Sequence, residues 1–187
     1  MDVNEHSLDD KIVKAAFDEF LEHGFQSASL NKISSKAGIT IGALYTRYKN
    51  KDALFCSLIQ EVFSIQEKSK SIVQMYYKVR ETKNVDDLID AIKREDRIYL
   101  DILFQYYYEC ILFFCKSTGN SIDAMLNKMM EQKSKETVLF LRELLNISED
   151  EIDLDRVGMV IIEQFQIYKM ILKNGYDKKK AVSCMEA

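Results

Sequence analysis

No proline occurs among the 187 residues of this chain, and glycine occurs only six times. These two residues most often end helices and form turns, so a chain with long runs free of both is most easily helical. Strand signals are weak, because clusters of β-branched residues are brief and the alternation of apolar and polar residues is never sustained. The sequence therefore predicts an all-α fold, with about nine helices.

The composition is that of a globular protein, with 47% apolar and 30% charged residues. The four cysteines form no Cys-x-x-Cys pair and only two histidines accompany them, so we predict neither a metal site nor a cofactor. The N-terminal residues are acidic, unlike a secretion signal, and no stretch reaches the ~18 uncharged apolar residues of a membrane span. We therefore expect a cytoplasmic protein without a membrane partner.

A short basic stretch, residues 29–51, stands out in an otherwise acidic chain. It contains five lysine or arginine residues and no acidic residue, while the chain has a formal net charge of −4, which leaves −9 (−4 minus +5) for the rest. A basic island inside an acidic protein indicates a polyanionic partner, and the phosphate backbone of DNA is the obvious one.

Two short helices joined by a tight turn are predicted within this stretch. Ser29 is the expected N-cap of a helix that ends at Ala37, and Gly38 supplies the positive φ that the turn requires. Thr40 is expected to cap the second helix, in which Leu44 faces inward. This is a helix-turn-helix arrangement, whose second helix enters the major groove of DNA.

The second helix leaves small and polar side chains exposed. Gly42 and Ala43 permit the close approach of another surface, and Tyr45 and Arg47 can hold phosphate oxygens. Lys51 begins the next helix, where a cation opposes the helix dipole at a cost of about 0.3–1 kcal/mol unless a phosphate is nearby. That next helix is predicted to continue to about residue 78. The alternative for the second helix of the helix-turn-helix is a solvated connector with a chance basic bias.

These residues resemble the DNA-binding domain of the TetR family of bacterial transcriptional regulators. The resemblance covers about residues 8–57 and is carried by Ala37-Gly38-Ile39-Thr40-Ile41-Gly42-Ala43-Leu44-Tyr45, Tyr48, Asn50-Lys51-Asp52 and Leu54-Phe55. By that resemblance the DNA contacts are Ser29, Thr40, Gly42, Ala43, Tyr45 and Lys51, to which exposure on the second helix adds Ile41 and Arg47. We expect a DNA-binding domain over residues 1–50 and a helical effector-binding and dimerisation domain over residues 51–187.

The segment 97–116 is the most apolar and aromatic part of the chain and is predicted to be a central helix. By resemblance, TetR proteins bind ligands between helices of this domain, in a pocket suited to a small hydrophobic or aromatic effector. The alternative is that the same residues fill a helical core. The candidates for the ligand site are Tyr76, Tyr99, Phe104, Tyr107, Tyr108, Glu109, Cys110, Phe113, Met125, Met129 and Phe165.

The helix predicted from residue 154 to about residue 174 is apolar on more faces than docking on its own domain needs. A partner explains the surplus most simply, and a two-fold homodimer is the commonest one. In TetR relatives the last two helices build the dimer interface. The predicted interface residues are Val157, Val160, Ile161, Gln164, Tyr168 and Ile171.

The sequence contains no Gly-rich phosphate loop, no Gly-x-Ser-x-Gly and no His-Glu-x-x-His, so we predict no catalytic residues and no enzyme. It predicts a homodimeric, ligand-responsive transcriptional regulator, a repressor that binds double-stranded DNA at an inverted-repeat operator and is released by a small-molecule effector. The rival hypothesis is a helical protein-interaction module that binds no specific DNA sequence.

Overall fold

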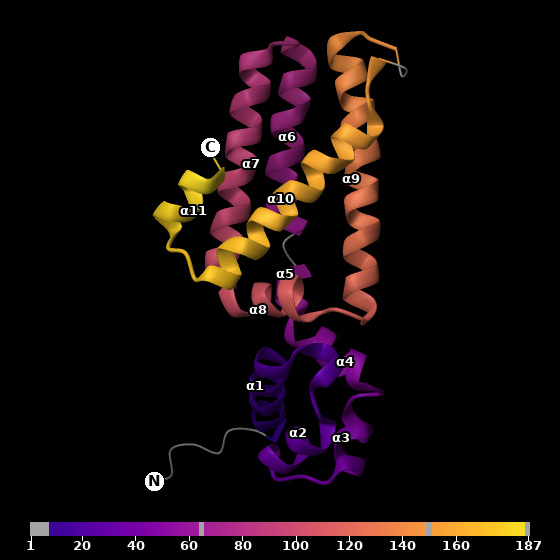
Figure 1. The fold of residues 1–187 in the computed structure, drawn as a ribbon, viewed down its shortest axis with the longest axis vertical. Helices are drawn as coiled ribbons and strands as arrows, with labels where there is room; N and C mark the ends of the chain where they lie inside the picture. The colour runs from indigo at the N-terminus through magenta and orange to yellow at the C-terminus, as the bar shows by residue number, and fades with distance from the viewer. Residues whose placement is uncertain (1–7, 64–65, 149–150, 186–187) are drawn as a thin grey trace. The chain divides into compact units, whose positions relative to one another are not determined.

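The computed structural model describes residues 8–63, 66–148 and 151–185, and all regular secondary structure in these ranges is helical (Figure 1). The predicted all-α fold is confirmed. Eleven α-helices and one short π-helix are described, against about nine expected, because two long predicted helices are interrupted.

Contacts within the chain divide it into two compact units. The first comprises residues 1–61 and 108–124, and the second comprises residues 62–107 and 125–187. The chain therefore leaves the second unit after Tyr107, contributes a segment to the first unit, and then returns. The expected functional boundary after residue 50 stays a prediction, and the compact units differ from it in extent.

The first unit is built on a small aromatic core. Its helices are α1 (Leu8–Ser27), α2 (Leu30–Ala37), α3 (Ile41–Arg47), α4 (Lys51–Leu58), most of α8 (Tyr107–Ile111) and the π-helix η1 (Leu112–Lys116). The rings of Phe20 and Phe55 meet edge to face with centroids 5.0 Å apart, and Phe25 lies 5.6 Å from Phe55. Gly24, at φ 71° and ψ 172°, breaks α1 and turns Phe25 back onto this core.

The helix predicted from Lys51 to about residue 78 is wrong as a single element. Ile59 ends α4 with φ −115° and ψ 12°, and α5 (Gln60–Phe63) and α6 (Gln66–Thr82) follow. Residues 64–65 lie outside the described ranges. No glycine or proline marks the break at Ile59, and this side chain is fully buried, so packing rather than a local breaker ends the helix.

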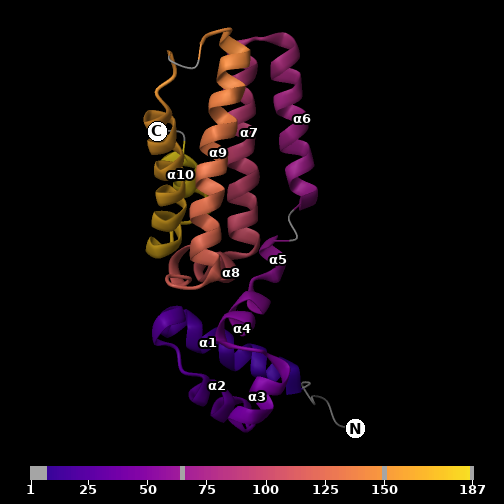
Figure 2. The same ribbon diagram turned by 90° about the vertical axis from the view of Figure 1, so that its right-hand side faces the viewer.

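The second unit is a set of long helices. They are α6, α7 (Val85–Gln105), most of α9 (Ser121–Leu145), α10 (Leu154–Asn174) and α11 (Lys178–Met185). Figures 1 and 2 show α6, α7 and α9 running side by side, with α10 crossing them obliquely. Val79, Ala91, Phe140 and Leu144 form a buried cluster between α6, α7 and α9.

The aromatic segment 97–116 is not one helix, because its apolar residues belong to two cores. α7 ends at Gln105, and Leu100 and Leu103 are buried in the second unit. Leu112 and Phe113 are buried in the first unit. Among the described helices none is by itself long and apolar enough to span a membrane, and α7 reaches that limit only as a bent pair with the residues that follow it.

Candidate nucleic-acid interface

Caps and a glycine turn build the predicted helix-turn-helix. Ser29 is the N-cap of α2, and its Oγ accepts the N–H of Lys32 at 3.4 Å. Gly38 ends α2 in the left-handed region, at φ 72° and ψ 30°. The Oγ1 of Thr40 accepts the N–H of Ala43 at 3.1 Å and so caps α3. The local geometry is that predicted from the sequence.

The predicted DNA-contacting residues lie around α3, but they are not equally exposed. Leu44 is buried, as expected, and holds α3 to the core. Tyr45 is 51% exposed, and its hydroxyl has no hydrogen-bond partner within the described chain. Thr40 is exposed, whereas Ile41 is half-buried, as is Ala43.

Gly42 is a position at which the fold does not require glycine. Its φ is not positive, and an added Cβ would meet only the Oγ1 atom of Thr40 within 4 Å, at 3.9 Å. Glycine costs a helix about 0.5–1 kcal/mol relative to alanine. A glycine that the protein's own packing does not need is expected where another surface approaches the backbone.

The two predicted phosphate-binding cations have partners within the protein. The Arg47 Nε donates to Asp9 Oδ1 at 2.9 Å, in a surface pair that is worth at most about 1 kcal/mol and that a phosphate can replace. The Lys51 Nζ donates to the Gln26 carbonyl at 3.1 Å and lies 5.1 Å from the Phe25 ring centroid. Burial lowers the pKa of the Lys51 ammonium, and the Glu19 carboxylate opposes this shift. Lys51 therefore also has a structural role, which the sequence analysis did not foresee.

Glu19, on α1, was missed by sequence reasoning. Its side chain is 1% exposed, and Oε1 accepts the N–H of Ser29 at 3.0 Å. Oε2 accepts no hydrogen bond within the described residues, and the His23 Nε2 and Lys36 Nζ atoms each lie 3.8 Å from it. The only signal was spacing, because an acid three residues after the buried Ala16 falls on the apolar face of α1.

The family model for the bacterial regulatory proteins of the tetR family matches residues 12–58, the segment that holds this helix-turn-helix. Residues 12–58 therefore belong to this family. The resemblance described from the sequence is thereby confirmed.

Full-length comparisons agree with this assignment. The uncharacterized HTH-type transcriptional regulator YdgC of Bacillus subtilis is 23% identical over 159 residues, which cover 81% of this chain and 74% of that protein. The structure of the transcriptional regulator FadR from Bacillus subtilis, in complex with stearoyl-CoA, has a TM-score of 0.55 at 19% identity and covers 94% of this chain and 95% of its own. A TetR-like regulator from Rhodococcus sp. RHA1 has a TM-score of 0.56 at 15% identity, covering 99% and 94%. These relatives are transcriptional regulators rather than enzymes.

The candidate effector residues divide between the two compact units. Tyr108, Glu109, Cys110 and Phe113 belong to the first unit, and the other candidates belong to the second. Burial raises the pKa of the Cys110 thiol to about 12, so it stays protonated as a core residue. The effector role of these residues stays a prediction.

A buried polar network, missed by sequence reasoning, links four helices of the second unit. Glu95 on α7 is 7% exposed, and it accepts hydrogen bonds from the Tyr76 Oη at 2.5 Å and the Lys133 Nζ at 2.9 Å. The Lys133 Nζ also donates to Gln164 Oε1 at 3.5 Å, and the Gln164 Nε2 donates to Asp96 Oδ1 at 2.8 Å. We call these five residues, from α6, α7, α9 and α10, the polar network.

Tyrosines surround the polar network. The Lys133 Nζ lies 5.3 Å from the Tyr99 ring centroid, and Tyr99 lies 6.2 Å from Tyr168. Burial, and then the charge of Glu95, raises the pKa of Tyr76 and of Tyr99, so both phenols remain protonated donors. The centre of this unit therefore holds polar groups as well as the apolar residues expected there.

The predicted dimer face of α10 points mostly into its own unit. Ile161, Tyr168 and Ile171 are buried within the chain, and Gln164 belongs to the polar network, so these side chains are not available to a partner. Of the other two predicted residues, Val157 is half-buried and Val160, at 65% exposure, faces outward. The other exposed apolar residues of α10 are Leu154, Met159, Ile162 and Met170.

Proposed function

We propose that this TetR-family transcriptional regulator is a repressor that binds an inverted-repeat operator as a homodimer and is released by a small hydrophobic or aromatic effector. Each α3 would enter the major groove of one half-site, with half-sites spaced by about 34–36 Å, one helical turn, or a multiple of it. The observation that carries the proposal is the exposed face of α3, where Gly42 serves no internal packing need.

The side chains around Gly42 suit this role. The Tyr45 hydroxyl is free to meet a phosphate, and Arg47 can exchange its surface pair with Asp9 for one with DNA. Ile41 and Ala43 offer apolar contact to thymine methyl groups. Such a helix would contact the phosphate backbone of DNA through few groups and would recognise sequence mainly through DNA shape and contacts with methyl groups.

The homodimer would use the outward face of α10 rather than the predicted one. Met159, Val160 and Ile162 are exposed on it, which is unusual for three large apolar side chains so close in sequence. A two-fold axis at this face would bring the same residues of two chains together.

Relatives support the choice of effectors to test first. The FadR of Bacillus subtilis was solved with stearoyl-CoA, so fatty acyl derivatives are the first candidates here. A signal cannot pass along one continuous helix from the first unit to the second, because α4 ends at Leu58. The segment 108–124 offers another covalent route, since it belongs to the first unit and joins α7 to α9.

Selection of bound sequences from random DNA, followed by titration, tests the proposal. We expect an inverted repeat whose affinity falls steeply with salt. Tyr45→Ala should weaken binding about tenfold, or about 1.4 kcal/mol, whereas Tyr77→Ala, at an exposed tyrosine of the second unit, should leave it unchanged. Failure to retard any DNA, with capture of a protein partner instead, would favour the protein-interaction module.

A further inference from the structure

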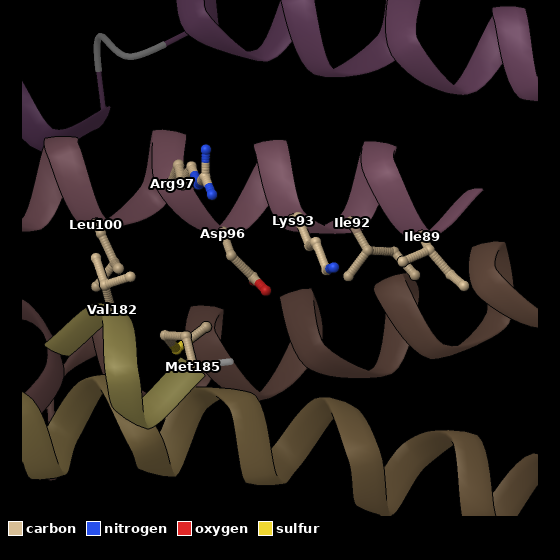
Figure 3. Close-up of a pocket in the computed structure, with 8 residues that line it drawn as sticks. All are labelled: Ile89, Ile92, Lys93, Asp96, Arg97, Leu100, Val182 and Met185. Atoms are coloured by element: carbon tan, nitrogen blue, oxygen red, sulfur yellow. The ribbon is translucent and has the colours of Figure 1, made fainter. Parts of the chain in front are cut away.

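A groove between α7 and α11 of the second unit has no part in the proposed function. Its volume is about 270 Å³, close to the lower limit of about 300 Å³ for small-molecule sites. Its apolar lining, shown in Figure 3, consists of Ile89, Ile92, Leu100, Val182 and Met185. Ile89 and Ile92, which are exposed to solvent, form one end of the groove, and Leu100 and Val182 form the other (Figure 3).

The middle of the groove is charged, because Lys93 and Asp96 lie on α7 between Ile92 and Leu100 (Figure 3). Lys93 and Asp96 extend from α7 toward the side on which Met185 lies, while the Arg97 side chain points away from α11 (Figure 3). Asp96 is already engaged, because it accepts the Gln164 Nε2 hydrogen bond. The Lys93 ammonium has no ion-pair or hydrogen-bond partner in the described part of the chain. The uncommitted charge of the groove is therefore positive.

We propose that this groove binds a medium-chain aliphatic monocarboxylate, with the carboxylate at Lys93 and the tail along Leu100, Val182 and Met185. One ammonium matches one negative charge, and the neighbouring Asp96 disfavours a polyvalent anion such as a phosphate ester. The groove volume of about 270 Å³ lies near the lower limit of about 300 Å³ for small-molecule sites, which favours a medium chain over a long one.

Asp96 connects the groove to the interior of the second unit. It lines the groove, and through Gln164 it joins the Lys133–Glu95 pair between α9 and α7. A carboxylate bound at Lys93 places a like charge near Asp96, which changes the balance of charge in the polar network. Occupancy of the groove would thus be transmitted to α10 and α9, and this regulatory step rests on the proposed function.

Calorimetric titration of the full chain with octanoate and, separately, with octylammonium tests the binding step. We expect octanoate to bind and octylammonium to bind at least tenfold more weakly, because only the sign of the head group differs. Val182→Glu should abolish octanoate binding, while Ser183→Glu, on the exposed side of α11, should keep it. Equal binding by these two variants, or preference for octylammonium, would overturn the proposal.

The charged middle of the groove is tested by three further variants. Lys93→Gln should weaken octanoate binding about two- to fivefold, the range for a partly exposed ion pair. Arg94→Gln, at the next and exposed position of α7, is the matched control and should bind as the parent does. Asp96→Asn should bind octanoate more tightly, since it removes a like charge. A weaker Asp96→Asn complex would show that the groove prefers a cation.

The regulatory step is read separately, from the operator affinity with and without octanoate. Octanoate should change this affinity in Ser183→Glu and leave it unchanged in Val182→Glu. Octanoate binding without any effect on operator affinity would overturn the regulatory step alone. Operator binding by a chain that does not bind octanoate would overturn the groove and leave the repressor proposal standing.

Discussion

Each compact unit of this regulator buries one glutamate, and the two are held in different ways. Glu19 in the first unit accepts a backbone N–H, from Ser29, and its nearest lysine nitrogen, of Lys36, lies 3.8 Å away. Glu95 in the second unit is bound by side chains, from Tyr76 and Lys133 within 2.9 Å and also from Tyr99. One carboxylate is fixed to the main chain, and the other to groups that can change rotamer.

The difference matches the role proposed for each unit. The backbone bond of Glu19 fixes the start of α2 to α1, which keeps the helix-turn-helix in one geometry. The partners of Glu95 come from helices far apart in the sequence, and a network of side chains can rearrange without breaking any helix. The first unit therefore fixes its carboxylate to the backbone, whereas the second has a centre whose side chains can rearrange.

The largest effect is expected from Glu19→Ala. It removes a charge-assisted bond to the Ser29 N–H in a buried site, which should lower the free energy of unfolding by about 2–3 kcal/mol. Urea unfolding measures this, and operator affinity should fall with it because α2 loses its anchor. Asp18→Ala, at the adjacent exposed position, should change stability by less than about 0.5 kcal/mol. Similar losses of unfolding free energy in the two variants would show that Glu19 does not anchor the start of α2.

Double-mutant cycles on the two glutamate–lysine pairs should separate the units further. The Glu95–Lys133 pair is close and partly buried, so we expect a coupling free energy of about 1 kcal/mol. The Glu19–Lys36 pair is longer and its lysine is half exposed, so its coupling should stay below about 0.5 kcal/mol. Alanine variants measured by urea unfolding provide both cycles. Larger coupling in the Glu19 pair would reverse the comparison.

The sequence predicted the first unit well because its determinants are contiguous. Ser29, Gly38 and Thr40 act within three or four residues of themselves, so caps and turn can be read from spacing. The family match confirms that reading. Glu19 escaped notice because its partner Ser29 becomes a neighbour only after α1 and α2 pack together.

The second unit was harder to predict because its decisive contacts are non-local. Glu95 follows the buried Ala91 by four residues, which places both on one face of α7, but nothing local points to Lys133 on α9. The end of α4 at Ile59 likewise has no glycine or proline to mark it. The outward face of α10 could not be chosen from a helix that is apolar on several sides.

Gly42→Ala should improve the fold of the first unit while weakening its function. An alanine Cβ has room at this position, and alanine favours a helix over glycine by about 0.5–1 kcal/mol, so stability should rise slightly. Operator affinity should fall, because the added methyl group keeps the backbone from DNA. Thermal unfolding and DNA titration measure the two effects. Unchanged affinity would mean that nothing approaches Gly42.

The smallest effect is a pH dependence that belongs to the second unit. Burial raises the pKa of Asp96 above 3.8, against the opposing hydrogen bond from Gln164, with Glu95 adding to the shift and Lys133 opposing it. An acid whose pKa is raised in the folded state stabilises that state at pH values below its unfolded-state pKa. This stabilisation is lost as the pH rises through its folded-state pKa. Asp96→Asn has no carboxyl group to ionise at this position. The melting temperature of the variant should therefore rise relative to that of the parent as the pH rises from about 4 toward neutrality. Asp90→Asn, at an exposed position of α7, should show no such trend. Because Asp96 lines the groove, octanoate should enlarge the difference between parent and Asp96→Asn if the groove and the polar network are coupled, and leave it unchanged if they are not.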